Sequence, residues 1–116
     1  MTNQNYFYCK DGQLKSIKLD KIFYLEAADN YVKFHEAGGY QLVRTTLEKA
    51  LCEMGERKFV RIFRSYAVPV DLIDTISKDM VYLAIADKKA LPVSARYYPE
   101  IIKEIKIINR VCDPME

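Results

Sequence analysis

Between residues 57 and 66 the chain carries four basic side chains and no acidic one: Arg57, Lys58, Arg61 and Arg64. Guanidinium and ammonium groups bind phosphate oxygens. A local basic face on a chain with a net charge of only +2 is typical of a protein that binds a phosphate backbone. The same run could instead be a solvated charged edge that discourages strand aggregation. Charge alone leaves both interpretations open.

Asn30 and Arg96 are two further positions whose side chains suit contact with nucleic-acid bases. Asn30 follows Asp29 at a break between two apolar runs, and its amide can bind a base edge. Arg96 lies two residues after Ser94, where we expect the last helix to begin. Arginine binds guanine through a two-pronged contact, and a helix N-terminus favours phosphate. Each position also has an ordinary interpretation, because Asp29-Asn30 is common turn chemistry and Arg96 could form a structural salt bridge.

Patterns that would support catalysis or metal binding are weak. Asp71 and Asp74 could be proposed as an acid and a base, but the apolar residues between them are typical of a turn leading into a strand. His35 is the only histidine, and neither a CxxC pair nor a glycine-rich phosphate loop occurs. We therefore expect no enzymatic activity, no metal and no cofactor. We interpret the three cysteines as small buried or half-buried residues, with a Cys–His pair formally open for the first two: Cys9, Cys52 and Cys112.

The composition is that of a globular protein. Half of the 116 residues are hydrophobic and 29% are charged, so we expect residues 1–116 to form one domain with its own core. No apolar run approaches the roughly 18 residues that a membrane span needs. The first eight residues lack the basic and apolar regions of a signal peptide. These features predict a cytoplasmic protein.

Short strands joined by tight turns account for most of the chain. The dipeptides Asp11-Gly12, Asp29-Asn30 and Gly38-Gly39 mark turns, and the dense apolar run 22–27 predicts a central strand. Pro69 indicates an edge or a bulge. Strands are expected at residues 6–8, 14–19, 22–27, 31–35, 40–43, 67–70, 73–77, 81–85 and 90–93.

Two helices are expected among these strands. The first has Thr45 as N-cap of a capping box with Glu48, and Gly55 is a favourable C-cap. Ser94 and Pro99 open the second, whose buried stripe would be Ile101, Ile102, Ile105 and Ile108. The pattern predicts an all-β dominated fold of about eight to ten short antiparallel strands, with one short central helix and a C-terminal helix.

Three ordered blocks of sequence resemble the LytTR family of bacterial DNA-binding domains. They are residues 22–33, residues 43–47 followed by 59–68, and residues 91–98. The resemblance covers residues 6–108, which we take as the core of the domain. It implies an elongated body of antiparallel sheets packed side by side. It also implies binding of duplex DNA through loops that read successive major grooves.

The resemblance implies biological partners as well. Domains of this family are output domains of transcriptional regulators, commonly response regulators of two-component systems in which a phospho-receiver domain precedes the DNA-binding domain. Two copies bind tandem DNA sites, so a homodimer on DNA is expected, and a receiver domain would lie outside this sequence. No membrane partner is implied.

Site residues follow from the resemblance position by position. The base-reading residues would be Asn30, Arg64 and Arg96. The phosphate-binding residues would be Lys33, Arg44, Arg61, Ser65 and Tyr97. These roles fit the side chains, because Arg and Asn match base edges while Lys and Ser suit phosphate oxygens. Phe63 stands where the family usually has histidine and is left out of the site.

Two other functions remain open from the residues alone. The chain could be a β-rich protein-interaction module that uses an exposed edge strand or the basic face 57–64. It could also bind RNA by stacking bases on some of its nine tyrosines, although the strand pattern places most of them in cores or cross-strand pairs.

Overall fold

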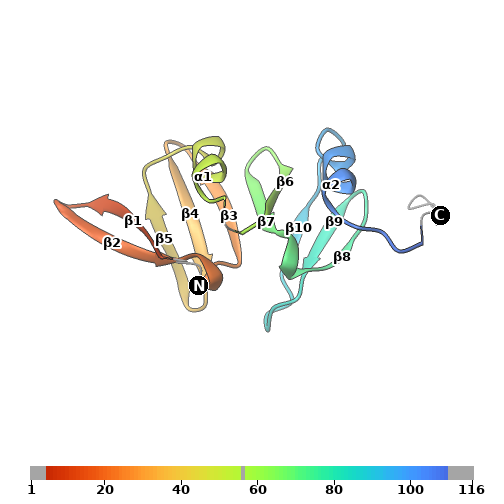
Figure 1. Ribbon diagram of the computed structural model, residues 1–116, viewed down its shortest axis with the longest axis horizontal. Helices are drawn as coiled ribbons and strands as arrows, with labels where there is room; N and C mark the ends of the chain where they lie inside the picture. Colours follow the sequence, from red (N-terminus) through yellow and green to blue (C-terminus); the bar gives the residue numbers. More distant parts are fainter. Residues whose placement is uncertain (1–4, 56, 110–116) are drawn as a thin grey trace.

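Three antiparallel sheets lie side by side in the computed structural model, which describes residues 5–55 and 57–109 (Figure 1). These residues form ten strands and two α-helices, one central and one C-terminal. The principal extents of 53 × 34 × 27 Å make the body elongated. The expected all-β dominated fold of short antiparallel strands with two helices is confirmed.

The first sheet is a hairpin of β1 (Asn5–Lys10) and β2 (Gln13–Lys18). Its turn is Asp11-Gly12, and both turn residues have positive φ, 51° and 77°. A type I′ turn requires positive φ at both central residues, which Asp and Gly adopt more easily than bulkier residues. The turn predicted from this dipeptide is confirmed.

The central sheet has five strands in the order β5-β4-β3-β7-β6. The run predicted as a central strand forms the middle one, which is paired on both sides. A β-bulge between Arg61 and Phe63 interrupts the pairing of the last two strands. Pro69 ends an inner strand beyond the residues that pair with β3, so its missing N–H leaves that ladder intact. The strand bounds are β3 (Tyr24–Ala28), β4 (Tyr31–Glu36), β5 (Gly39–Val43), β6 (Phe59–Phe63) and β7 (Tyr66–Pro69).

The third sheet has the order β10-β9-β8. It consists of β8 (Ile73–Ile76), β9 (Met80–Leu83) and β10 (Ala90–Pro92). Two short 3-10 helices that the sequence pattern did not predict, η1 (Leu19–Lys21) and η2 (Val70–Leu72), precede β3 and β8. Each carries the chain from one sheet to the next.

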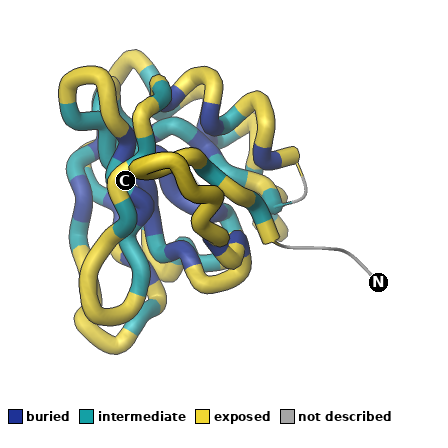
Figure 2. Tube along the Cα trace, turned by 90° about the vertical axis from the view of Figure 1, so that its left-hand side faces the viewer, coloured by how far each residue is buried: buried dark blue, intermediate teal, exposed yellow. Residues whose placement is uncertain are grey.

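Two apolar cores lie on opposite faces of the central sheet. Adjacent residues of β7 show the division, since Ala67 packs in the first core and Val68 in the second. This follows from the two-residue period of side chains along a strand. The first core includes the central helix and the hairpin, and the second includes the third sheet and the C-terminal helix. Figure 2 shows the buried segments inside and the exposed turns outside.

The central helix, α1 (Leu47–Glu53), begins one residue later than predicted. Thr46 is the N-cap, because its Oγ1 accepts a hydrogen bond from the Lys49 N–H at 3.2 Å. The prediction of Thr45 as N-cap was therefore wrong by one position. Met54 is the C-cap, and the following Gly55 does not adopt the left-handed conformation that would require glycine.

The cap gives a prediction for stability. Thr46→Ala should lower the free energy of unfolding by about 1 kcal/mol, because the Lys49 N–H loses its acceptor. Urea unfolding followed by circular dichroism measures this loss. The control Thr45→Ala should cost less than about 0.5 kcal/mol. An equal loss in both variants would contradict the assignment of Thr46 as the cap.

The C-terminal helix, α2 (Tyr98–Glu104), has Tyr97 as its N-cap, so the expected start at Ser94 was wrong. It is also shorter than the isoleucine pattern suggested. Ile101 is fully buried, and Ile102 and Ile105 are half-buried. Ile108 is fully exposed, so its place in the buried stripe was wrong. The reason is that Ile105 has extended dihedral angles and ends the helical period. None of the helices within residues 5–55 and 57–109 could cross a membrane.

The outer face of the β1–β2 hairpin is open to solvent. Phe7 and Leu14 are 62% and 72% exposed, and Cys9 lies on the same face opposite Leu14. Cys52 is also exposed. The expectation that these two cysteines are buried or half-buried was wrong, because only the inner face of the hairpin packs on a core. Cys112 lies outside the described residues.

A ring cluster covers the face of the central sheet that lies away from α1. The rings of Tyr24 and His35 stack with centroids 4.1 Å apart, and His35 Nε2 lies 2.9 Å from Glu26 Oε1. Burial lowers the pKa of His35, and the nearby Lys33 and Lys89 lower it further, against the raising effect of Glu26. Burial and the charge of Glu26 raise the pKa of Tyr24.

The lowered pKa of His35 predicts how stability depends on pH. A group whose folded pKa is depressed contributes stability above its unfolded pKa, about 6.5 for histidine, and this stability is lost as the pH falls through the folded pKa. The urea midpoint should therefore decrease more steeply below pH 6.5 in the wild type than in His35→Gln. Parallel decreases in the two proteins would show that His35 is not responsible.

Candidate nucleic-acid interface

Two turns that carry predicted site residues lie at the same end of the central sheet. The β3–β4 turn is Asp29-Asn30, and the β6–β7 turn is Arg64-Ser65. The Ala27 N–H donates to the Ser65 carbonyl at 2.8 Å, which holds the second turn beside the end of β3. Both turns lie along the upper edge of the molecule in Figure 1.

The loop between β10 and α2 continues this edge. The Ser94 N–H donates to the Ile62 carbonyl of β6 at 2.8 Å, so the loop begins directly beside the central sheet. Ser94 then organises the loop, because its Oγ accepts from the Arg96 N–H and its carbonyl accepts from the Tyr97 N–H. The three elements form one row, which we call the turn edge: residues 29–30, 64–65 and 94–97.

The turn edge brings together the three residues predicted to read bases. Asn30, Arg64 and Arg96 are all exposed. The ion pairs within the described part of the chain involve other side chains. The guanidinium groups of Arg64 and Arg96 and the amide group of Asn30 are therefore open to a ligand. Asp29, with φ 57°, makes the tight turn that presents Asn30.

Four of the five residues predicted to bind phosphate lie on or beside the turn edge. Arg44 is exposed and directly follows β5, whose last residue pairs with Val32 at the same end of the sheet. Ser65 and Tyr97 belong to the edge itself and are half-buried. Arg61 is half-buried, and its Nη2 donates to the Arg64 carbonyl at 2.6 Å.

Lys33 is the predicted residue that the structure does not bring to this edge. It pairs with Glu26 and Leu42 in the middle of the sheet. Its Nζ lies 4.8 Å from the ring centroid of Tyr40, a residue still farther from the edge. The phosphate role of Lys33 stays a prediction from the resemblance, and this placement does not support it.

The basic run at residues 57–64 divides into two pairs with different surroundings. Arg57 has only 11% of its side chain exposed, and its Nη1 donates to the carbonyls of Leu19 and Ile22. Lys58 forms a 2.8 Å ion pair with Glu104. Arg57 therefore joins elements of the fold, whereas Lys58 is 56% exposed and pairs with Glu104 at the surface. Only Arg61 and Arg64 reach the turn edge.

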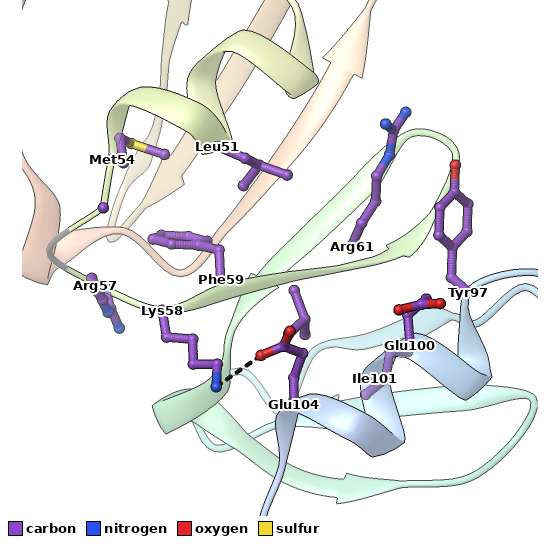
Figure 3. Close-up of a pocket in the computed structure, with 12 residues that line it drawn as sticks. Leu51, Met54, Arg57, Lys58, Phe59, Arg61, Tyr97, Glu100, Ile101 and Glu104 are labelled. Carbon is purple, nitrogen blue, oxygen red and sulfur yellow. Dashed lines mark ion pairs between the residues drawn. The ribbon is translucent and has the colours of Figure 1, made fainter.

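Figure 3 shows a groove between α1 and α2 that is lined by Arg57, Lys58 and Arg61. Leu51 of α1, its C-cap Met54 and Ile101 of α2 line it together with Phe59 of β6. The Lys58–Glu104 ion pair lies at one end of the groove and Arg61 with Tyr97 at the other.

Two acidic side chains at or near the turn edge were not predicted from the sequence to belong to the site. Asp29 and Glu48 line a hollow with Arg61 at the start of α1. The pattern had marked Asp29 as a turn residue and Glu48 as part of a capping box. Their approach to Arg61 depends on the pairing of β3 with β7, which no local signal reports. The edge thus offers hydrogen-bond acceptors as well as donors.

The chain was compared with protein-family models, curated sequences and solved structures. The family model described as the LytTr DNA-binding domain matches residues 12–106. Among solved structures, the chain is similar to a LytTr DNA-binding domain from Bacillus cereus, described as part of a methyl-accepting/DNA response regulator. The TM-score is 0.69 at 20% identity, covering 88% of this chain and 96% of that one. No curated protein sequence matches. Because the family model covers most of its length, the chain belongs to the LytTR family of DNA-binding domains.

Proposed function

We propose that the chain binds double-stranded DNA sequence-specifically as the DNA-binding domain of a bacterial transcriptional regulator. The turn edge would enter the major groove, where Asn30, Arg64 and Arg96 read base edges. The phosphate contacts would come from Arg44, Arg61, Ser65 and Tyr97. The observation that carries this proposal is that three exposed donors from three separate corners lie along one edge.

The dimensions of the edge support this mode of binding. The five strand ends of the central sheet span about 19 Å at the usual spacing of about 4.8 Å. A major groove is about 12 Å wide, so the edge can reach phosphates on both sides of it. The body as a whole is 53 Å long, more than the roughly 34 Å between successive major grooves on one face of a duplex. We propose that loops at different points along this axis read successive grooves.

The biological setting is part of the same proposal. The Bacillus cereus domain is described as part of a response regulator, and we infer the same output role here, with a receiver domain outside this sequence. Two copies would bind tandem sites, with a homodimer forming on the DNA. Because the chromosome of a bacterium lies in its cytoplasm, the proposal implies a cytoplasmic protein. It requires binding and no catalysis.

Salt dependence tests the electrostatic part of the proposal. If about four phosphates are neutralised, log affinity should fall with log salt concentration at a slope near −4. A fluorescence-anisotropy titration at several salt concentrations gives the slope. Arg44→Ala should reduce its magnitude by about 1. The control Lys21→Ala removes an exposed cation at the other end of β3 and should leave the slope unchanged. A salt-independent affinity would rule out phosphate contacts.

The target DNA sequence can be identified by selecting bound duplexes from a random pool. Repeated selection of random duplexes on the immobilised protein should enrich one motif, and the enriched duplex should bind about 1000-fold or more tightly than a scrambled one. Enrichment without a shared motif would contradict sequence-specific binding.

One observation favours a second function. The edge strand β5 exposes Tyr40 and Leu42, which are 51% and 38% accessible, and an exposed strand edge can pair with another chain. The basic face 57–64 gives this alternative less support, because Arg57 binds backbone carbonyls of the fold and Lys58 is paired with Glu104. A protein-interaction module would show no retention on random duplex DNA at low salt.

A further inference from the structure

Arg61 and Tyr97 connect two corners of the turn edge that belong to different sheets. Arg61 lies on β6 beside the β-bulge, and its Nη2 holds the carbonyl of Arg64 at 2.6 Å. Its guanidinium carbon lies 5.4 Å from the ring centroid of Tyr97. Figure 3 shows the two side chains extending next to each other from β6 and from the loop before α2.

Arg96 approaches the same ring. Its guanidinium carbon lies 5.5 Å from the centroid of Tyr97. One aromatic ring therefore contacts two cationic side chains, one from the central sheet and one from the loop that follows the third sheet. Cation–π attraction to the shared ring offsets the repulsion between the two guanidinium groups.

Hydrogen bonding of Arg61 is limited to a few partners. Its Nε is buried and has no hydrogen-bond partner among the described residues. The ion pairs of the described ranges also leave it out. The side chain is therefore positioned by its hydrogen bond to the Arg64 carbonyl and by its contact with the Tyr97 ring. A lysine could not reproduce both contacts, since it lacks the planar fork.

We propose that Arg61 and Tyr97 are positioning residues that hold Arg64 and Arg96 at a fixed separation on the turn edge. The inference rests on the proposed function, because the separation matters only if both arginines read the same duplex. It assigns the ring of Tyr97 a role that differs from the phosphate contact of its hydroxyl group. The preset spacing lowers the entropy lost when both corners dock together.

The first test needs no DNA. Backbone ¹⁵N order parameters of residues 64–65 and 96–97 should be near 0.85 in the wild type and in Tyr97→Phe, and should fall below about 0.6 at both corners in Tyr97→Leu. Arg61→Lys should show the same loss, and it carries the test if Tyr97→Leu does not fold. Tyr82→Leu, at an exposed tyrosine of β9, is the control and should change neither corner. Unchanged order parameters in Arg61→Lys and in folded Tyr97→Leu overturn the proposal.

The second test measures readout with the selected and scrambled duplexes. Tyr97→Phe removes only the proposed phosphate contact, so it should weaken binding to both duplexes equally. Tyr97→Leu and Arg61→Lys should lose about tenfold more affinity for the selected duplex than for the scrambled one. If Tyr97→Phe loses as much discrimination between the two duplexes as Tyr97→Leu, the hydroxyl group matters and the Arg61–Tyr97 contact has no role in readout. If the wild type binds neither duplex, the proposed function fails, and the order parameters still decide whether Arg61 and Tyr97 fix the two corners.

Discussion

Replacing Arg57 with methionine should destabilise the fold by about 3 kcal/mol, which corresponds to a decrease of roughly 10 °C in Tm. The guanidinium donates to the carbonyls of Leu19 at 2.7 Å and Ile22 at 2.9 Å, and its Nε donates to Asp71 at 3.1 Å. One side chain thus joins η1, which leads into β3, to η2, which leads into β8. Methionine keeps most of the apolar contact and leaves these acceptors without their donor. Calorimetry and urea unfolding measure the loss.

The control for this prediction separates the backbone contacts from the ion pair. Asp71 is 66% exposed, so Asp71→Asn should cost no more than about 1 kcal/mol. The loss of stability in Arg57→Lys should lie between the losses in Arg57→Met and Asp71→Asn, because an ammonium cannot reach all three acceptors in the same geometry. The salt slope of DNA binding should be unchanged in Arg57→Met. A reduced salt slope with normal stability would show that Arg57 contacts DNA.

Local chemistry explains why the strands were predictable from the sequence. A dipeptide such as Asp11-Gly12 specifies its own turn, and alternation of apolar residues specifies which face of a strand is buried. The central position of β3 followed from its dense apolar run. The three sequence blocks identified the family correctly, since the family model matches residues 12–106.

Contacts between distant segments explain what the sequence pattern missed. Arg57 and Lys58 carry the same charge as Arg61 and Arg64, and only the structure reveals that Arg57 binds the carbonyl of Leu19 and that Lys58 pairs with Glu104 of α2. The stripe ending at Ile108 failed for a similar reason, since the backbone of Ile105 leaves the helical conformation. The sequence pattern alone does not show which distant residues a side chain contacts or where a helix ends.

The candidate site was also predicted only in part from the sequence. The resemblance placed Asn30, Arg64 and Arg96 in turns or at a helix entry, and the structure brings them to one edge. It could not show that the side chain of Lys33 lies over Tyr40, on the face away from α1. Strand register decides such placements, and register depends on the pairing of the whole sheet.

Arg96→Ala and Arg64→Ala should each weaken binding to the selected duplex by about 1–3 kcal/mol and relax discrimination at one base position. Both guanidinium groups are exposed and outside the ion pairs of the described residues, so their removal leaves the fold intact. A two-pronged contact to guanine is made only when that base is present. Binding to a scrambled duplex should therefore fall much less, as titrations with the two duplexes would show.

Comparing the double variant with its parents makes this prediction more specific. Independent base contacts would give additive losses, whereas corners held at a fixed separation should give a double-variant loss smaller than the sum, because the first loss already disrupts joint docking. Lys21→Ala removes the same charge at the far end of β3 and should affect both duplexes little. Equal losses on selected and scrambled duplexes would show that these arginines contact only phosphate, and base reading would then have to come from elsewhere on the edge.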